Sequence, residues 1–372
     1  MEIDWSPCLF YTMRYSLLIF TMVGLLAGCS RSVNPSQTPT GGGTTIPSTA
    51  VRPASLGIVG DAADVNTTVS GGLVLMGGGK DVDAAFQWMI SRSGGGDVVI
   101  IRASGTEAYN PYVFGLGKVN SVETLKIDSR SLADNDTVAS IIRNAEMLFI
   151  AGGDQSDYMN YWRGTKTQAA INYLLTEKKA PVGGTSAGCA IMSGFYYSGE
   201  NGSVVSADAL ANPFHQNINL YNNDFLKAPY LQNVITDQHY LTRTREGRSV
   251  VFLARIMNDW KIAAKAIAAD ERTAVCIDNS GHAKVYGIAT SAGTFSNAYF
   301  IATDINKKPE ALLPAQTVNW NQGGKALSVY EIQASESGNG QFNVADFSLA
   351  EASGGKKYWW YIENGTLIKK EQ

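Results

Sequence analysis

Short apolar runs alternate with helical patterns along the chain from about residue 71. Runs at 73–76, 98–101 and 147–150 have the length of buried strands. Apolar positions within 84–89 and 166–177 recur instead at helical spacing. Strands and helices that alternate in this way predict right-handed crossovers and a mostly parallel sheet with helices on both faces. The expected fold is therefore α/β, a three-layer sandwich.

The pattern changes past residue 291, where short apolar stretches are separated by Gly, Asn and Ser. The stretches at 358–362 and 366–368 flank Asn364-Gly365, a pair typical of a two-residue hairpin turn. Residues 291–372 are thus expected to form a β-rich C-terminal extension. Packing on the edge of the sheet is the favoured arrangement, with a small separate module or a binding surface as alternatives.

The N-terminal segment has the pattern of an export signal. Met13-Arg14 precedes an apolar run at 17–26, which is too short for a comfortable membrane span. Leu26-Ala27-Gly28-Cys29 follows and resembles the lipobox of bacterial lipoproteins, in which the cysteine is acylated. Residues 1–28 are predicted to be a lipoprotein signal peptide that starts at Met13. An ordinary cleaved signal and an uncleaved anchor are the alternatives.

These features predict an exported protein that is lipid-anchored through Cys29 in the bacterial cell envelope. Ser30 after the cysteine favours the outer membrane or the cell surface. Residues 29–69 are rich in Ser, Thr, Pro and Gly, which predicts a flexible tether. The α/β domain is expected at 70–290.

Composition excludes several classes of partner. The 372 residues carry a net charge of -3 and no long basic run, so no nucleic-acid partner is expected. With three histidines and no Cys-x-x-Cys, no metal site is expected either. Cys189 and Cys276 lie in apolar runs and are expected to be buried thiols.

A glycine triplet at 77–79 follows the first strand, where cofactor loops often lie. Val82 replaces the third glycine of a dinucleotide fingerprint, and Asp81 replaces the Ser or Thr of a phosphate loop. No cofactor is therefore expected. The triplet is interpreted as a backbone loop at the carboxyl ends of the strands, where open α/β sheets bind their ligands.

The segment Gly184-Thr185-Ser186-Ala187-Gly188 has the Gly-x-Ser-x-Gly pattern of a nucleophile elbow. In such an elbow a strand turns sharply into a helix, and the glycines relieve crowding around the turn. Ser186 is the predicted nucleophile. The amide of Ala187 would point toward a developing oxyanion.

A serine hydroxyl needs a base, which is usually histidine. His239 ends an apolar strand at 234–238 and is the predicted base, whereas His215 and His282 are interpreted as exposed loop residues. An α/β-hydrolase-type esterase that uses His282 remains an alternative.

The base also needs an acid to orient its imidazole. The apolar stretch 265–269 ends at Asp270-Glu271. Glu271 is the predicted acid, because Asp270 would face the other way if the strand pleat continued. Glu200 is the alternative.

Three arginines, Arg243, Arg245 and Arg248, follow the predicted base within ten residues. Guanidinium groups bind carboxylates in a bidentate manner, so the cluster indicates an acidic substrate. A solvated helix start with surface ion pairs is the alternative.

Together these motifs resemble the cyanophycinase and aspartyl dipeptidase family of serine peptidases. The matching stretches, in the family's order, are 101–105, 149–155, 183–188, 237–248 and 270–274. The resemblance spans about residues 70 to 290. It implies a class I glutamine amidotransferase-like fold and a triad of Ser186, His239 and Glu271.

The resemblance also implies an oxyanion hole from the amides of Gly153 and Ala187. The substrate-binding residues that it implies are Gln155, Asp237, Gln238, Arg243, Arg245 and Arg248. The implied function is a serine-type exopeptidase or isopeptidase that hydrolyses β-aspartyl linkages, releasing β-Asp-Arg from cyanophycin or acting on related aspartyl peptides. A homodimer is also implied. A catalytically inactive surface lipoprotein that binds peptide or glycan is the rival from another class.

Overall fold

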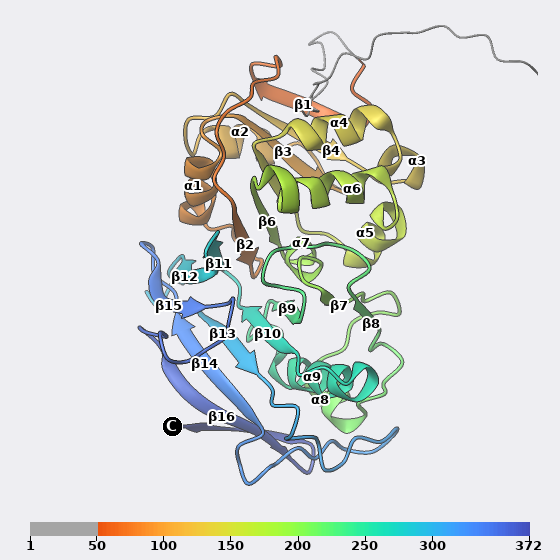
Figure 1. The fold of residues 1–372 in the computed structure, drawn as a ribbon, viewed down its shortest axis with the longest axis vertical. Helices are drawn as coiled ribbons and strands as arrows, with labels where there is room; N and C mark the ends of the chain where they lie inside the picture. Colours follow the sequence, from red (N-terminus) through yellow and green to blue (C-terminus); the bar gives the residue numbers. More distant parts are fainter. Residues whose placement is uncertain (1–50) are drawn as a thin grey trace, which may run out of the picture. The chain divides into compact units, whose positions relative to one another are not determined.

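The computed structural model describes residues 51–372. The predicted signal peptide, Cys29 and the first part of the predicted tether lie outside the described residues. Two β-sheets, called sheet A and sheet B below, form the framework of the described part (Figure 1).

Sheet A has nine strands, five of which form one parallel run. The strands are β1 (Ser55–Gly60), β2 (Gly72–Met76), β3 (Asp97–Arg102), β4 (Ser121–Lys126), β5 (Met147–Ile150), β6 (Pro181–Thr185), β11 (Thr273–Asp278), β12 (His282–Gly287) and β15 (Asn339–Asn343). Their order is β1-β4-β3-β5-β6-β2-β11-β12-β15. Strands β4, β3, β5, β6 and β2 pair in parallel, and the others pair antiparallel.

Helices cover both faces of the parallel strands. These helices are α1 (Asp83–Arg92), α2 (Tyr109–Phe114), α3 (Arg130–Ala133), α4 (Asp136–Asn144), α5 (Gln155–Trp162), α6 (Lys166–Tyr173), the π-helical turn η1 (Leu174–Lys178) and α7 (Ala187–Ala190). Two further helices, α8 (Ser206–Ala211) and α9 (Glu246–Trp260), pack in the core of sheet B instead. Val74 and Met76 of β2 pack in the core with α1 and α2, while the alternate residues Leu73 and Leu75 pack in the core with α4 and α6. The predicted three-layer α/β fold is confirmed.

Local chemistry explains where several of these elements lie. Strand β5 is buried along its whole length, as expected for a parallel strand between two helical layers. Helix α4 begins after Asn135, whose side chain accepts hydrogen bonds from the amides of Thr137 and Val138. The second predicted helix changes to π geometry after Tyr173, and its final turn is η1.

Sheet B has eight strands and contains most of the C-terminal residues. Its strands are β7 (Phe195–Tyr197), β8 (Leu220–Asn222), β9 (Val234–Gln238), β10 (Lys265–Ala269), β13 (Asn297–Ala302), β14 (Leu327–Gln333), β16 (Lys356–Glu363) and β17 (Thr366–Glu371). Their order is β17-β16-β14-β13-β10-β9-β7-β8. The hairpin predicted around Asn364-Gly365 joins β16 to β17.

The C-terminal residues contribute to both sheets. Strand β13 pairs with β10 in sheet B, whereas β15 pairs with β12 in sheet A. Phe300 of β13 stacks on Phe342 of β15 with ring centroids 4.2 Å apart. The β-rich extension therefore completes the two sheets and fills the core where they approach each other.

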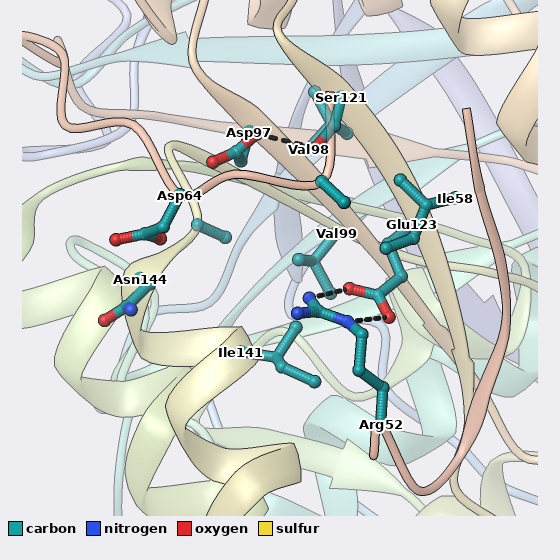
Figure 2. A pocket seen from close by; sticks show the side chains of 12 residues that line it. Arg52, Ile58, Asp64, Asp97, Val98, Val99, Ser121, Glu123, Ile141 and Asn144 are labelled. Carbon is teal, nitrogen blue, oxygen red and sulfur yellow. Dashed lines mark hydrogen bonds and ion pairs between the residues drawn. The ribbon is translucent and has the colours of Figure 1, made fainter. Parts of the chain in front are cut away.

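Part of the predicted tether belongs to the fold, which corrects the boundary at residue 69. Strand β1 pairs antiparallel with β4, and Arg52 forms an ion pair with Glu123 of β4, with Nη2 and Oε2 2.5 Å apart. Figure 2 shows this pair among the residues that line a small cavity, whose volume is about 30 Å³. Because residues 29–69 are rich in glycine and polar residues, the sequence did not predict β1, an edge strand that is only half buried.

Within residues 51–372, no helix is both long enough and apolar enough to cross a membrane.

Candidate active site

Ser186 occupies a strained turn between β6 and α7. Its φ of 52° and ψ of -116° lie in a region that residues with a side chain rarely adopt. The flanking glycines are required by space: a Cβ on Gly184 would lie 2.6 Å from the Gly188 carbonyl, and one on Gly188 would lie 2.1 Å from the Ile150 oxygen. The strand, turn and helix predicted from Gly-x-Ser-x-Gly are all present.

His239 brings an imidazole to this serine from the other sheet. It follows β9 of sheet B, and its Nε2 lies 2.7 Å from Ser186 Oγ. Its φ is also positive, at 49°, and its amide donates to the Gly77 carbonyl. Helix α7, which begins directly after Ser186, contacts both β6 of sheet A and β9 of sheet B (Figure 1). This contact brings the end of β9 close to Ser186.

Glu271 completes a chain of three side chains. Its Oε1 lies 2.6 Å from His239 Nδ1, and it stands in the turn that joins β10 to β11. Asp270 instead accepts hydrogen bonds from the amide and hydroxyl of Thr242. The alternative acid, Glu200, is exposed and accepts a hydrogen bond from the Tyr221 hydroxyl. The geometry therefore favours Glu271 as the acid.

The surroundings favour the neutral form of the imidazole. Burial lowers the pKa of His239 below its usual value, and the cations Arg243 and Arg245 act in the same direction. The hydrogen bond to Glu271 opposes them without reversing the shift. A neutral imidazole that is bonded to a hydroxyl can accept its proton.

The glycine triplet packs directly against the histidine and the glutamate. A Cβ on Gly78 would lie 2.3 Å from His239 Cε1, and one on Gly79 would lie 2.9 Å from Glu271 Oε2. A Cβ on Gly77 would overlap the Asp270 carbonyl oxygen at 2.0 Å. The triplet thus provides the room in which these two side chains sit. Sequence reasoning placed it at the correct sheet edge and missed this role.

Two groups near Ser186 could stabilise an oxyanion. Ala187 is the first residue of α7, where a helix provides no acceptor for its amide. In the loop after β5, a Cβ on Gly152 would lie 3.3 Å from the Ser186 Cβ. The neighbouring Gly153 was predicted from the sequence to have this role. A Cβ added to Gly153 would point toward the Tyr158 hydroxyl. The oxyanion role of its amide stays a prediction.

Two of the predicted substrate-binding residues face inward. Asp237 and Arg248 are 2% and 1% exposed and pair with each other, with Nη2–Oδ1 and Nε–Oδ2 distances of 2.5 and 3.0 Å. Burial alone would raise the pKa of Asp237, but the guanidinium of Arg248 holds it below the usual value. The sequence pattern could not show that Arg248 and Asp237 form a buried ion pair with each other. Neither presents a free charge to a ligand.

Arg245 and Gln238 are buried as well. Arg245 donates from Nη1 to the Gln238 carbonyl at 2.8 Å, and burial lowers its pKa to about 10. Arg243 differs, because its side chain is 53% exposed and its Nε lies 4.0 Å from Glu271 Oε1. Gln155 is half-buried, and a Cβ on Gly199 would lie 2.7 Å from its Nε2. Of the six predicted residues, Arg243 and Gln155 are thus the ones that the structure leaves accessible.

The remaining candidate residues lie elsewhere. His282 begins β12 and contacts Ser280 and Glu351, so the imidazole bonded to Ser186 is that of His239. Cys189 and Cys276 are buried free thiols, whose pKa values burial raises far above the usual range. Within residues 51–372, no group of three or more His, Cys, Asp or Glu side chains could hold a metal ion.

A serine hydroxyl bonded to an imidazole that is bonded to a carboxylate is the arrangement found in serine hydrolases. The profile of Peptidase family S51 matches residues 73–285. The chain belongs to this family of serine peptidases, which includes cyanophycinases, peptidase E and aspartyl dipeptidases. The family predicted from the sequence motifs is confirmed.

Solved structures show more distant similarity. A peptidase from an acI-B1 actinobacterium is 18% identical, with a TM-score of 0.44 over 60% of this chain and 89% of the other. A putative peptidase E from Listeria monocytogenes EGD-e is 19% identical, with a TM-score of 0.37 over 59% of this chain and all of the other. No curated protein matches the chain.

Proposed function

We propose that this protein is a serine peptidase that hydrolyses aspartyl peptides through an acyl-enzyme. The observation that supports this most strongly is the continuous chain from Ser186 to His239 to Glu271, with contacts of 2.7 and 2.6 Å. Nucleophile, base and orienting acid come from three separate turns, and each is held by glycines or by strained backbone.

In the proposed mechanism, His239 Nε2 takes the Ser186 proton as Oγ bonds to the scissile carbonyl carbon. The carbonyl oxygen becomes an oxyanion beside the Ala187 amide and the loop at residues 152–153. The imidazolium, held by Glu271, then gives its proton to the leaving amine, and the carbon–nitrogen bond breaks. Water, deprotonated by the same imidazole, then attacks the acyl carbon. The bond between that carbon and Oγ breaks, the imidazolium returns its proton to Oγ, and the acid product leaves.

The preference for an acidic substrate rests on Arg243. Its guanidinium is half-exposed and lies beside Glu271, so it can bind a substrate carboxylate next to the reacting centre. The family supports the finer proposal, which is hydrolysis of β-aspartyl linkages in cyanophycin or related aspartyl peptides. Gln155, the first residue of α5 after the loop that carries the glycine pair, is the second proposed substrate ligand.

The location is proposed from the sequence alone. Leu26-Ala27-Gly28-Cys29 supports export and acylation at Cys29, which would anchor the enzyme in the bacterial cell envelope. A homodimer is proposed from the family resemblance.

The test compares the full chain with its Ser186→Ala variant. Cyanophycin and a panel of α- and β-linked aspartyl dipeptides are incubated with each, and the products are identified by mass spectrometry. Ser186→Ala should lower turnover by about 10³-fold or more while the melting temperature stays close to that of the wild type. Substitution of the exposed Ser203 by alanine is the matched control and should change neither.

Two results would overturn the proposal. Equal hydrolysis by the Ser186→Ala variant would remove the nucleophile assignment. A folded wild-type protein that hydrolyses no aspartyl peptide and reacts with no serine-directed fluorophosphonate would favour the inactive binding lipoprotein.

A further inference from the structure

Asp270, the residue before the proposed acid, is a buried carboxylate that connects two turns of the active site. It follows β10 and is 5% exposed, and its Oδ1 accepts hydrogen bonds from the amide and the hydroxyl of Thr242 at 3.0 and 2.9 Å. Thr242 belongs to residues 239–245, called the base turn below, which begin at His239 and lead from β9 into α9. One side chain thus ties the base turn to the turn that contains Glu271.

The base turn begins where the pairing of two neighbouring strands ends. Strands β9 and β10 are parallel neighbours in sheet B, and their last pair is Gln238 with Ala269. The residues that follow, His239 and Asp270, must therefore be held by contacts other than the strand ladder. The base turn also contains two residues with positive φ, His239 at 49° and Thr244 at 48°. Such backbone conformations persist only where the surrounding contacts enforce them.

The contacts of Asp270 form a closed ring that includes the proposed base. Its carbonyl oxygen packs so closely on Gly77 that an added Cβ there would lie 2.0 Å away. The Gly77 carbonyl accepts the amide of His239 at 2.8 Å, and the His239 carbonyl accepts the amide of Arg243 at 2.9 Å. Thr242, one residue before Arg243, closes the ring at the Asp270 carboxylate. The direction of the imidazole therefore depends on a contact made three residues further along the chain.

The turn that contains Glu271 is anchored on both sides by backbone hydrogen bonds. The amide of Asp270 donates to the Asn297 carbonyl at 3.2 Å, and the amide of Arg272 donates to the Gly78 carbonyl at 3.0 Å. This turn is thus a fixed point to which the base turn can be attached.

We propose that Asp270 is a positioning residue, whose carboxylate holds the base turn so that His239 faces both the nucleophile and Glu271. The inference rests on the proposed function, which assigns His239 as the base. The same contact places Arg243, which lies in the base turn, beside Glu271. The role requires an oxygen that accepts two hydrogen bonds, and the amide oxygen of asparagine can accept two as well.

The first test measures how fast variants of the full chain react with a serine-directed fluorophosphonate. Asp270→Ala removes the acceptor and should slow labelling by about 10- to 100-fold, because a small displacement of a catalytic group has an effect of this size. Asp270→Asn keeps the acceptor and should remain within about threefold of the wild type. Thr242→Val removes only the hydroxyl and should slow labelling by about 3- to 10-fold. In the Asp270→Ala background Thr242→Val should add no further loss, since both changes break the same contact.

Asp278→Ala is the matched control. Asp278 Oδ1 also accepts hydrogen bonds from the amide and the hydroxyl of one residue, Ser280, at 2.9 and 2.7 Å. It lies at the end of β11 that is remote from Glu271. Asp278→Ala should therefore lose comparable local contacts and leave the labelling rate unchanged.

The second test observes the imidazole directly and needs no substrate. The proton between His239 Nδ1 and Glu271 should give an NMR resonance well downfield of the backbone amides, and with three histidines in the chain His239→Gln suffices to assign it. Asp270→Ala should broaden or remove this resonance. Asp270→Asn and Asp278→Ala should retain it, which a general loss of stability in Asp270→Ala would not explain.

Three results would overturn the inference. The first is a wild-type labelling rate with an unchanged resonance in Asp270→Ala. If Asp270→Ala does not fold, the same pair of results in Thr242→Val is decisive instead. The third is an equal loss in Asp270→Asn, because the contact with Thr242 would then not explain the effect.

These measurements also separate the inference from the proposed function. A wild-type protein that has the downfield resonance, loses it in Asp270→Ala and hydrolyses no aspartyl peptide would support the role of Asp270 while refuting the proposed substrate. Hydrolysis of aspartyl peptides that Asp270→Ala leaves unchanged would refute the role of Asp270 and leave the proposed function standing.

Discussion

The Gly78→Ala variant should show how far displacement of His239, the proposed base, lowers activity beyond the effect of backbone strain alone. The added Cβ would lie 2.3 Å from His239 Cε1 and 2.6 Å from Nε2, whereas carbon atoms in contact lie about 3.5 to 4.0 Å apart. The imidazole must therefore move by about 1 Å, and a misplacement of this size costs on the order of 100-fold in rate. The φ of +99° adds an energetic cost of about 1–2 kcal/mol for any residue with a side chain.

Gly202→Ala is the matched control. Its φ is +103°, but the nearest atom to its new Cβ would be Asn217 Nδ2 at an ordinary 3.5 Å. Both variants should lose about 1–2 kcal/mol in urea denaturation. Only Gly78→Ala should lose about 100-fold in the rate of labelling by a serine-directed probe and in kcat/KM. Wild-type labelling by a folded Gly78→Ala protein would show that the imidazole position does not govern the reactivity of Ser186.

Three further predictions follow from the same geometry. Asp237→Ala leaves Arg248 buried without its partner, so it should lower the free energy of unfolding by about 3–5 kcal/mol. An unchanged urea midpoint would instead favour the substrate-binding role that the sequence predicted for Asp237. Arg243→Gln removes a cation that lowers the pKa of His239, so the acid limb of kcat/KM should move to higher pH. A neutral ester substrate keeps binding effects out of that profile, and a shift to lower pH would contradict it. Cys29→Ser should release the protein from the membrane fraction and remove the acyl mass from its N-terminus; continued membrane association would refute the anchor.

The sequence was most informative where short-range chemistry decides the structure. Buried parallel strands such as β5 are short apolar runs, and the hairpin at Asn364-Gly365 follows from turn geometry. The elbow around Ser186 needs glycines for a local steric reason, so its pattern is visible in five residues. The choice of Glu271 over Asp270 followed from the alternation of side chains along β10.

Long-range packing limited what the sequence could show. An arginine at a helix start has the same local pattern whether it faces solvent or, as Arg248 does, a buried aspartate. Strand β1 lies in a polar, glycine-rich segment, and its pairing with β4 depends on residues more than 60 positions away. Nothing near residue 291 indicates that the following strands would join two different sheets.

The residues of the proposed triad come from both sheets and from the connection between them. Ser186 follows a strand of sheet A, His239 follows a strand of sheet B, and Glu271 stands in the connection from one to the other. Strands made from the last 80 residues fill the seam between them. A nascent polypeptide that stops before these strands holds the serine without the support that fixes its proton acceptor. Hydrolysis is thus expected to depend on the packing between the two sheets as well as on the three side chains themselves.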